Sequence, residues 1–114
     1  MTIDASNVYG TLNMLLLQVL EHEELHGLEI QRRIEQLTGE SLRIEEGALY
    51  PALRRLERDG VVSSGWGVSE RRRRARFYRI TPKGKRRLAR ERTNWLEYVR
   101  AVRSVLRLGA EEPG

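Results

Sequence analysis

The spacing of apolar residues changes once along this sequence, at Gly60, and the change limits the folds that the chain can adopt. Before Gly60, apolar residues recur every three or four positions, as in amphipathic helices. The predicted helices are residues 8–21, 28–38 and 47–59. After Gly60, residues 61–66 and 75–80 are rich in the β-branched and aromatic side chains that favour strands. The sequence therefore predicts three short helices followed by a hairpin.

A single long helix is predicted after the hairpin. Thr81 can cap its first turn, and Pro82 can occupy the first helical position, where a missing N–H costs nothing. The pattern ends near Leu108, and residues 109–114 are expected to form a frayed tail. The predicted fold is mainly α with a small β-hairpin, all in one compact domain. It is a winged helix-turn-helix in residues 1–80 followed by a long C-terminal helix in residues 81–108.

The third helix has an outer face suited to duplex DNA, because this helix enters the major groove in a winged helix. Arginine can bond to guanine or clamp a phosphate, tyrosine can donate to a phosphate, and small residues allow close approach to the backbone. The predicted contacts are Gly47, Ala48, Tyr50, Arg54, Arg55 and Arg58. The alternative is that these arginines only form the solvated, exposed face of the third helix. Because Pro51 interrupts the pattern, either the regular helix starts near Ala48 or its first turn is distorted.

The hairpin tip is strongly basic. Residues 71–92 contain twelve Lys or Arg and one Glu, although the whole chain has a net charge of only +5. Adjacent like charges repel one another and gain nothing for folding, so a polyanion explains this run better than stability does. We expect phosphate contacts from Arg71, Arg72, Arg73, Arg74 and Arg76.

The last helix has a stripe of residues, here called the seam, that recur at alternating spacings of four and three, which is typical of a coiled coil. Its members are Leu88, Arg92, Trp95, Val99, Val102 and Leu106. At 1.5 Å per residue the helix is roughly 40 Å long, more than a three-helix core covers. A second copy of the chain would cover the remainder, and a symmetric homodimer would present two recognition helices to a palindrome. Alternatively, Trp95 lines a ligand cavity at that interface.

Four blocks of the sequence resemble, in order and spacing, the PadR-like (phenolic-acid-response) regulators. They are Gly10-Thr11-Leu12-Asn13-Met14-Leu15, His26-Gly27, residues 47–57 with their Tyr-Pro pair, and residues 77–84. The similarity covers roughly residues 9–106, and the short length resembles the subgroup with one C-terminal dimerisation helix. The resemblance implies a repressor of a nearby promoter, released by a small molecule or another signal, whose first and last helices build the dimer. The chain departs from the family at Glu23-Glu24 and at Leu28, where Gly-Pro and an aromatic residue are frequent.

The segment His22-Glu23-Glu24-Leu25-His26 matches H-E-x-x-H, the zinc metalloprotease signature. That chemistry requires an unbroken helix through both histidines and a third ligand. Here, His26-Gly27 is predicted to open the second helix, and the chain has no other His or Cys. We therefore expect His26 to cap that helix and His22 to be exposed, with no metal, no catalytic residue and no cofactor.

A general binder of RNA or anionic lipid is the remaining alternative. RNA modules usually stack bases on aromatic residues of an open sheet, and only Phe77 and Tyr78 could do so here. The chain has no cysteine, residues 1–9 do not resemble a signal peptide, and no apolar run could span a bilayer. The sequence therefore predicts a cytoplasmic, homodimeric regulator that binds double-stranded DNA and not membranes. An effector, if it has one, is not identified by any pattern.

Overall fold

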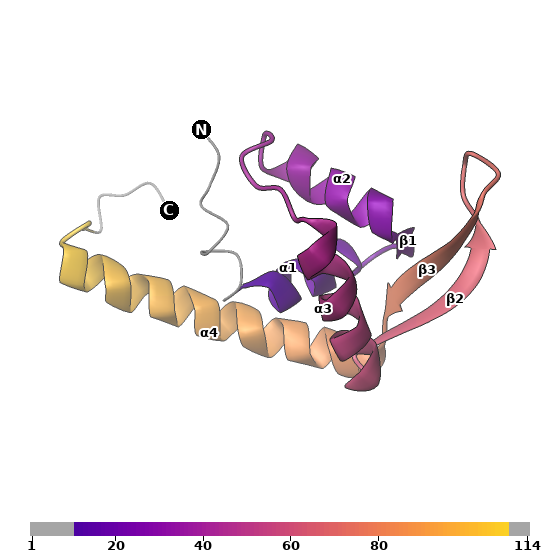
Figure 1. Cartoon of the computed structure of the whole chain (residues 1–114). Helices are drawn as coiled ribbons and strands as arrows, with labels where there is room; N and C mark the ends of the chain where they lie inside the picture. The colour runs from indigo at the N-terminus through magenta and orange to yellow at the C-terminus, as the bar shows by residue number, and fades with distance from the viewer. Residues whose placement is uncertain (1–10, 110–114) are drawn as a thin grey trace.

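The computed structural model describes residues 11–109, so the expected helix start at residues 8–10 and the tail at 110–114 lie outside the described residues. The elements are α1 (Leu12–Val19), β1 (Leu25–His26), α2 (Gly27–Leu37), α3 (Glu46–Arg58), β2 (Val62–Val68), β3 (Arg74–Ile80) and α4 (Pro82–Leu106) (Figure 1). The predicted fold class, mainly α with a winged helix, is confirmed. Within the described residues, no helix combines the length and apolar character needed to cross a membrane.

The sheet has one strand more than predicted. The two-residue strand β1 pairs antiparallel with β3, which gives the order β1-β3-β2. Leu25 lies opposite Tyr78 and His26 lies opposite Phe77. Two residues are too few to show an alternating pattern, so only the pairing with β3 defines this strand. The extra strand attaches the middle of β3 to the start of α2.

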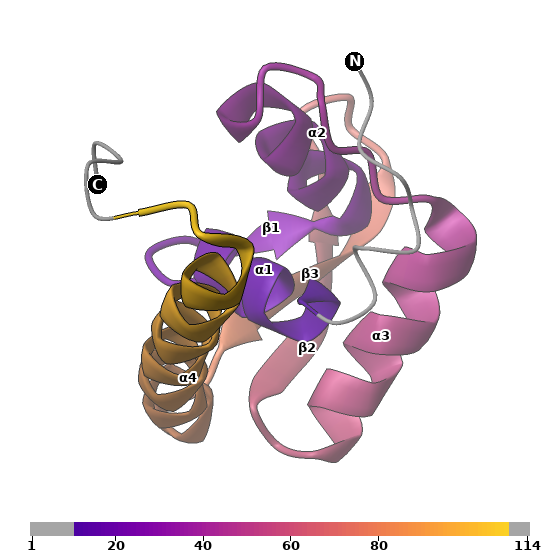
Figure 2. The ribbon, with the colours of Figure 1, turned by 90° about the vertical axis from the view of Figure 1, so that its left-hand side faces the viewer.

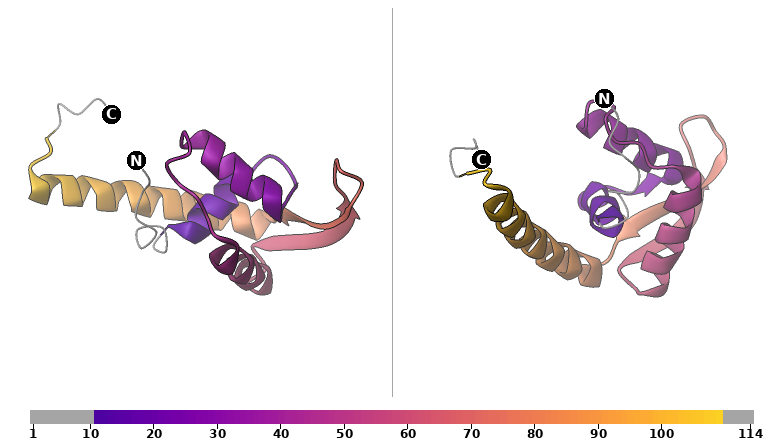
Figure 3. Two further views of the ribbon diagram at one scale, coloured as in Figure 1. Left: turned by 45° about the horizontal axis from the view of Figure 1, so that its top comes forward. Right: turned by 60° about the vertical axis from the view of Figure 1, so that its left-hand side comes forward.

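The core lies between α1, α2, α3 and the inner face of the sheet, and α1 separates α3 from α4 (Figure 2). Leu88, predicted to lie in the dimer seam, belongs to this core and is only 1% exposed. The prediction for this residue is wrong because the first turns of α4 pack on the domain. Only the later turns of α4 extend beyond it (Figure 3).

Helix α3 begins at Glu46, before Ala48, and continues through Pro51. The N–H groups of Ala48 and Leu49 both donate to the carbonyl of Glu45, at 3.0 and 2.9 Å, so the first turn is tight. Pro51 cannot donate to the carbonyl of Gly47. Because Gly47 is exposed, water can satisfy that carbonyl, and the helix tolerates the proline.

A hydrogen-bonded joint connects the end of α3 to the start of α4. Thr81 caps α4 as predicted, accepting from the Gly84 N–H at 3.1 Å. The Thr81 N–H donates to the Val61 carbonyl at 3.1 Å, and its hydroxyl donates to the Gly60 carbonyl at 2.7 Å. Gly60 adopts the left-handed conformation that this turn requires, with φ +75°. These bonds fix the direction of α4 relative to α3.

Replacing Gly84 with alanine should reduce the free energy of unfolding by roughly 1–3 kcal/mol, the usual cost of overpacking. A Cβ at this position would lie 2.1 Å from the Val61 carbonyl oxygen and 2.7 Å from Cγ1 of Ile80. Gly47→Ala is the matched control, because a Cβ there meets nothing within 4 Å and alanine favours helices. Urea unfolding of both variants tests the contact, and equal stability would contradict it.

Candidate nucleic-acid interface

The outer face of α3 is open to solvent, as predicted. Its inner side chains, Leu49, Ala52, Leu53 and Leu56, are fully buried. The predicted contact residues Gly47, Tyr50, Arg54, Arg55 and Arg58 are exposed, and Ala48 is half-buried. Within residues 11–109, none of these three arginine side chains has a hydrogen-bond or ion-pair partner. Their guanidinium groups are therefore available to an anion or a base edge.

Tyr50 reaches from α3 over the first turn of α2. A Cβ on Gly27 would lie 2.4 Å from the Tyr50 hydroxyl oxygen, so glycine is what allows this approach. Burial raises the pKa of Tyr50 above its ordinary value, and the carboxylate of Glu46 adds to the effect. The hydroxyl therefore keeps its proton at neutral pH and can donate a hydrogen bond to phosphate.

His26 caps α2, as expected from the sequence. Its Nδ1 accepts from the backbone N–H of Glu29 at 3.4 Å, and its ring meets the ring of Phe77 edge-on at 5.3 Å. Phe77 is half-buried and Tyr78 is buried, so neither offers the open stacking surface that an RNA-binding sheet requires.

The zinc-hydrolase alternative is wrong, because no helix passes through both histidines. His22 lies exposed in a bend, whereas His26 lies in β1. Glu23, which would activate water in such a site, is paired with Arg33. The Arg33 guanidinium lowers the pKa of this carboxyl, mainly through a hydrogen bond. Across residues 11–109 there is no group of three His, Asp or Glu side chains placed to hold a metal ion.

The wing tip consists of residues 69–73, three residues shorter than the predicted connection of residues 67–74. Arg72 has φ +58°, and its N–H donates to the Ser69 carbonyl at 2.8 Å, which closes the turn. The side chains of Arg71, Arg72 and Arg73 are exposed and have no partner among the described residues. Arg74, predicted in the tip, lies in β3 opposite Val68, because the hairpin pairing extends further than the aromatic pattern.

Arg74 and Arg76 both contact Trp66. Their guanidinium carbons lie 4.4 and 5.4 Å from the Trp66 ring centroid, in the range of cation–π interactions. The Arg76 Nε also donates to the Ser64 hydroxyl at 2.9 Å, and its Nη2 lies 3.5 Å from a Glu57 carboxylate oxygen. Arg76 therefore connects the wing to α3, in addition to the phosphate contact predicted for it.

Trp66 also belongs to this surface, although the sequence predicted only a strand at this position. Its side chain is 59% exposed. The register that places Trp66 opposite Arg76 would have revealed the contact, because residues opposite each other across a strand pair share one face.

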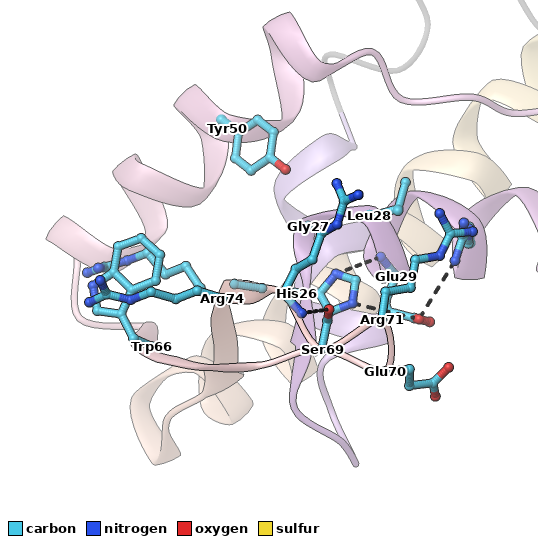
Figure 4. A pocket seen from close by; sticks show the side chains of 14 residues that line it. His26, Gly27, Leu28, Glu29, Tyr50, Trp66, Ser69, Glu70, Arg71 and Arg74 are labelled. Carbon is cyan, nitrogen blue, oxygen red and sulfur yellow. Dashed lines mark hydrogen bonds and ion pairs between the residues drawn. The ribbon is translucent and has the colours of Figure 1, made fainter.

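A cleft of about 400 Å³ separates the wing from α2 and α3 (Figure 4). Residues of β1, α2, α3, β2, β3 and the wing tip line it, among them Gly27, Tyr50, Trp66, Arg71 and Arg74. The start of α2 adds the positive end of a helix dipole to the guanidinium groups. The cleft therefore combines cations, a hydroxyl donor and an aromatic face, which together suit a nucleic-acid backbone.

The later turns of α4 leave apolar side chains uncovered. Trp95 is 42% exposed, with the Tyr98 ring centroid 6.4 Å from its own. Among the predicted seam residues, Arg92 and Leu106 are exposed and Val99 and Val102 are half-buried. Leu96, Tyr98 and Val105 are also exposed and widen the apolar surface beyond the predicted seam.

Comparison with known proteins points to one family. Residues 16–90 match the family model described as the transcriptional regulator PadR-like family. The chain is 37% identical over 89 residues to the transcriptional regulator Rv3488 of Mycobacterium tuberculosis, covering 75% of this chain and 79% of that protein.

Solved structures agree with this match. A transcriptional regulator from Clostridium thermocellum aligns with a TM-score of 0.81 and 29% identity, covering 90% of this chain and 97% of that one. Bacillus subtilis PadR, in complex with operator DNA, shares the fold with a TM-score of 0.62 and 23% identity. That alignment covers 75% of this chain and 46% of the Bacillus protein.

Proposed function

Because this chain belongs to the PadR-like family of transcriptional regulators, which are not enzymes, we propose that it represses transcription by binding a palindromic operator as a homodimer. Residues 1–80 form the DNA-binding region in this proposal, and residues 81–108 form the dimerisation helix. The resemblance found in the sequence is confirmed at the level of the family. The mode of binding and the direction of regulation are our inference.

The observation that carries the proposal is a set of six arginines on α3 and the wing tip whose side chains have no partner among the described residues. Arg54, Arg55 and Arg58 project from α3, and Arg71, Arg72 and Arg73 project from the wing tip. Such side chains can bond to guanine in the major groove and to phosphates beside it. The fold is also the one that holds operator DNA in Bacillus subtilis PadR.

The uncovered apolar surface of α4 supports the homodimer. Exposed tryptophan, tyrosine, leucine and valine on one helix are costly in water, and a two-fold related copy would bury them. Two recognition helices would then face two half-sites, one helical turn or a multiple apart. We place the protein in the cytoplasm, and we assign release from DNA to an unidentified effector that acts on the dimer.

A mobility-shift titration tests the proposal, using the region upstream of the protein's own gene with random duplex as competitor, at two salt concentrations. We expect a complex that survives competitor at nanomolar protein. If each subunit neutralises four or five phosphates, the slope of log K against log salt should be about −8 for the dimer. Binding that random duplex abolishes would contradict a sequence-specific regulator.

A further inference from the structure

A second cationic cleft lies outside the wing, where α3 ends and α4 begins. It measures about 690 Å³ and is lined by Arg58, Asp59, Val61, Lys83, Arg86, Arg87 and Arg90. The basic residues of α4 in this group are spaced so that they share one side of the helix. The single acidic residue among these lining residues is Asp59.

The charges in this cleft are unbalanced. The Asp59 carboxylate pairs with Arg87 at 3.3 Å, and Arg87 also lies 3.5 Å from a carboxylate oxygen of Glu91. Lys83 donates to the backbone carbonyl of Asp59 at 2.9 Å, which positions its ammonium group without neutralising it. Within the described residues, Arg58, Arg86 and Arg90 have no ion-pair partner. Four cations therefore face one cleft with no anion to neutralise them.

We propose that this cleft is a second contact for the phosphate backbone of duplex DNA, on the part of the operator that continues past the C-terminal end of α3. The inference rests on the proposed function. Arg58 belongs both to the exposed face of α3 and to the lining of the cleft, so the two cationic surfaces are continuous. Figure 1 shows the C-terminal end of α3 beside the first turn of α4.

Clustered like charges repel one another, and they gain nothing for folding unless an anion neutralises them. A DNA strand carries a phosphate every 3.4 Å of helix axis, so a strand that follows α3 could offer anions to the whole group. Contacts of this kind add affinity and register without base preference.

The double variant Arg86→Gln/Arg90→Gln tests the proposal in the full-length protein. Its binding is compared with that of the wild type on the duplex found in the mobility-shift titration, once trimmed to the half-sites and once extended by about one helical turn at each end. With two lost contacts per subunit, the salt slope on the extended duplex should become shallower by about 3 to 4. Between 50 and 200 mM salt, wild-type affinity should then fall roughly a hundredfold more than that of the variant.

The matched control is Lys85→Gln/Arg100→Gln, which removes two exposed charges of α4 that do not line the cleft. We expect the control to follow the wild type, and both variants to keep the wild-type melting temperature. An unchanged slope for the Arg86/Arg90 variant would overturn the inference, as would an equal loss on the trimmed duplex or a larger loss on single-stranded RNA. Absence of wild-type binding to any duplex would instead overturn the proposed function.

Discussion

Replacing Trp95 with glutamate should convert the protein from dimer to monomer and lower operator affinity by about three orders of magnitude, since bivalent binding typically adds a factor of 10² to 10⁴. Trp95 lies near the middle of α4 and is exposed, with the Tyr98 ring centroid 6.4 Å from its own. In a symmetric dimer the substitution would remove two indole rings from the interface and place two carboxylates near one another. Sedimentation velocity measures the oligomeric state, and fluorescence anisotropy with labelled operator measures affinity.

Thr93→Glu is the matched control for this experiment. It adds the same charge to an exposed position of α4, outside the apolar surface. We expect this variant to remain a dimer with near wild-type affinity. If Trp95→Glu also sediments as a dimer, the surface assigned to dimerisation is wrong.

Replacing Arg71, Arg72 and Arg73 together with alanine should weaken binding to operator and to random duplex by similar factors. These side chains are exposed and unpaired within the described residues, so their loss removes phosphate contacts and little else. The loss of three phosphate contacts per subunit should make the slope of log K against log salt shallower by about 5 for the dimer. Affinity measured at four or more salt concentrations gives this slope directly.

Arg76→Gln provides an informative comparison with the triple variant. Because Arg76 bonds to Ser64 and lies near Glu57, we expect its replacement to lower the free energy of unfolding slightly. The slope of log K against log salt should change by less than it does when one wing-tip phosphate contact is lost. A triple variant with the wild-type slope would exclude the wing tip from the binding mechanism.

The long helices and the hairpin were predictable because their signals repeat over many residues. The helical spacing of α3, the Thr81 cap of α4 and the hairpin after Gly60 all appear as predicted. Strand β1 was not predictable, since two residues have no period and their partner lies about fifty positions later. Long-range pairing of this kind depends on the folded sheet and has no local signature.

Predictions about single side chains also succeed where the signal is local and fail where it depends on distant parts of the chain. Exposure of Arg54 and Arg58 follows from the helical period alone, and the structure confirms that exposure. The core position of Leu88 and the bond from Arg76 to Ser64 depend on how far neighbouring elements overlap. A coiled-coil spacing gives the direction of an apolar stripe, but it does not reveal where the domain's own contacts end and a partner's begin.

The bonds of Thr81 to Gly60 and Val61 have a consequence for operator length. They hold each recognition helix at a fixed inclination to α4, so the distance between the two recognition helices in the proposed dimer depends on where the α4 helices cross. A shift of that crossing by seven residues would move each DNA-binding region by roughly 10 Å along the helix. Half-site sequence would thus be determined by α3, whereas the number of base pairs between half-sites would be determined by α4. The two properties could change independently as such sequences diverge.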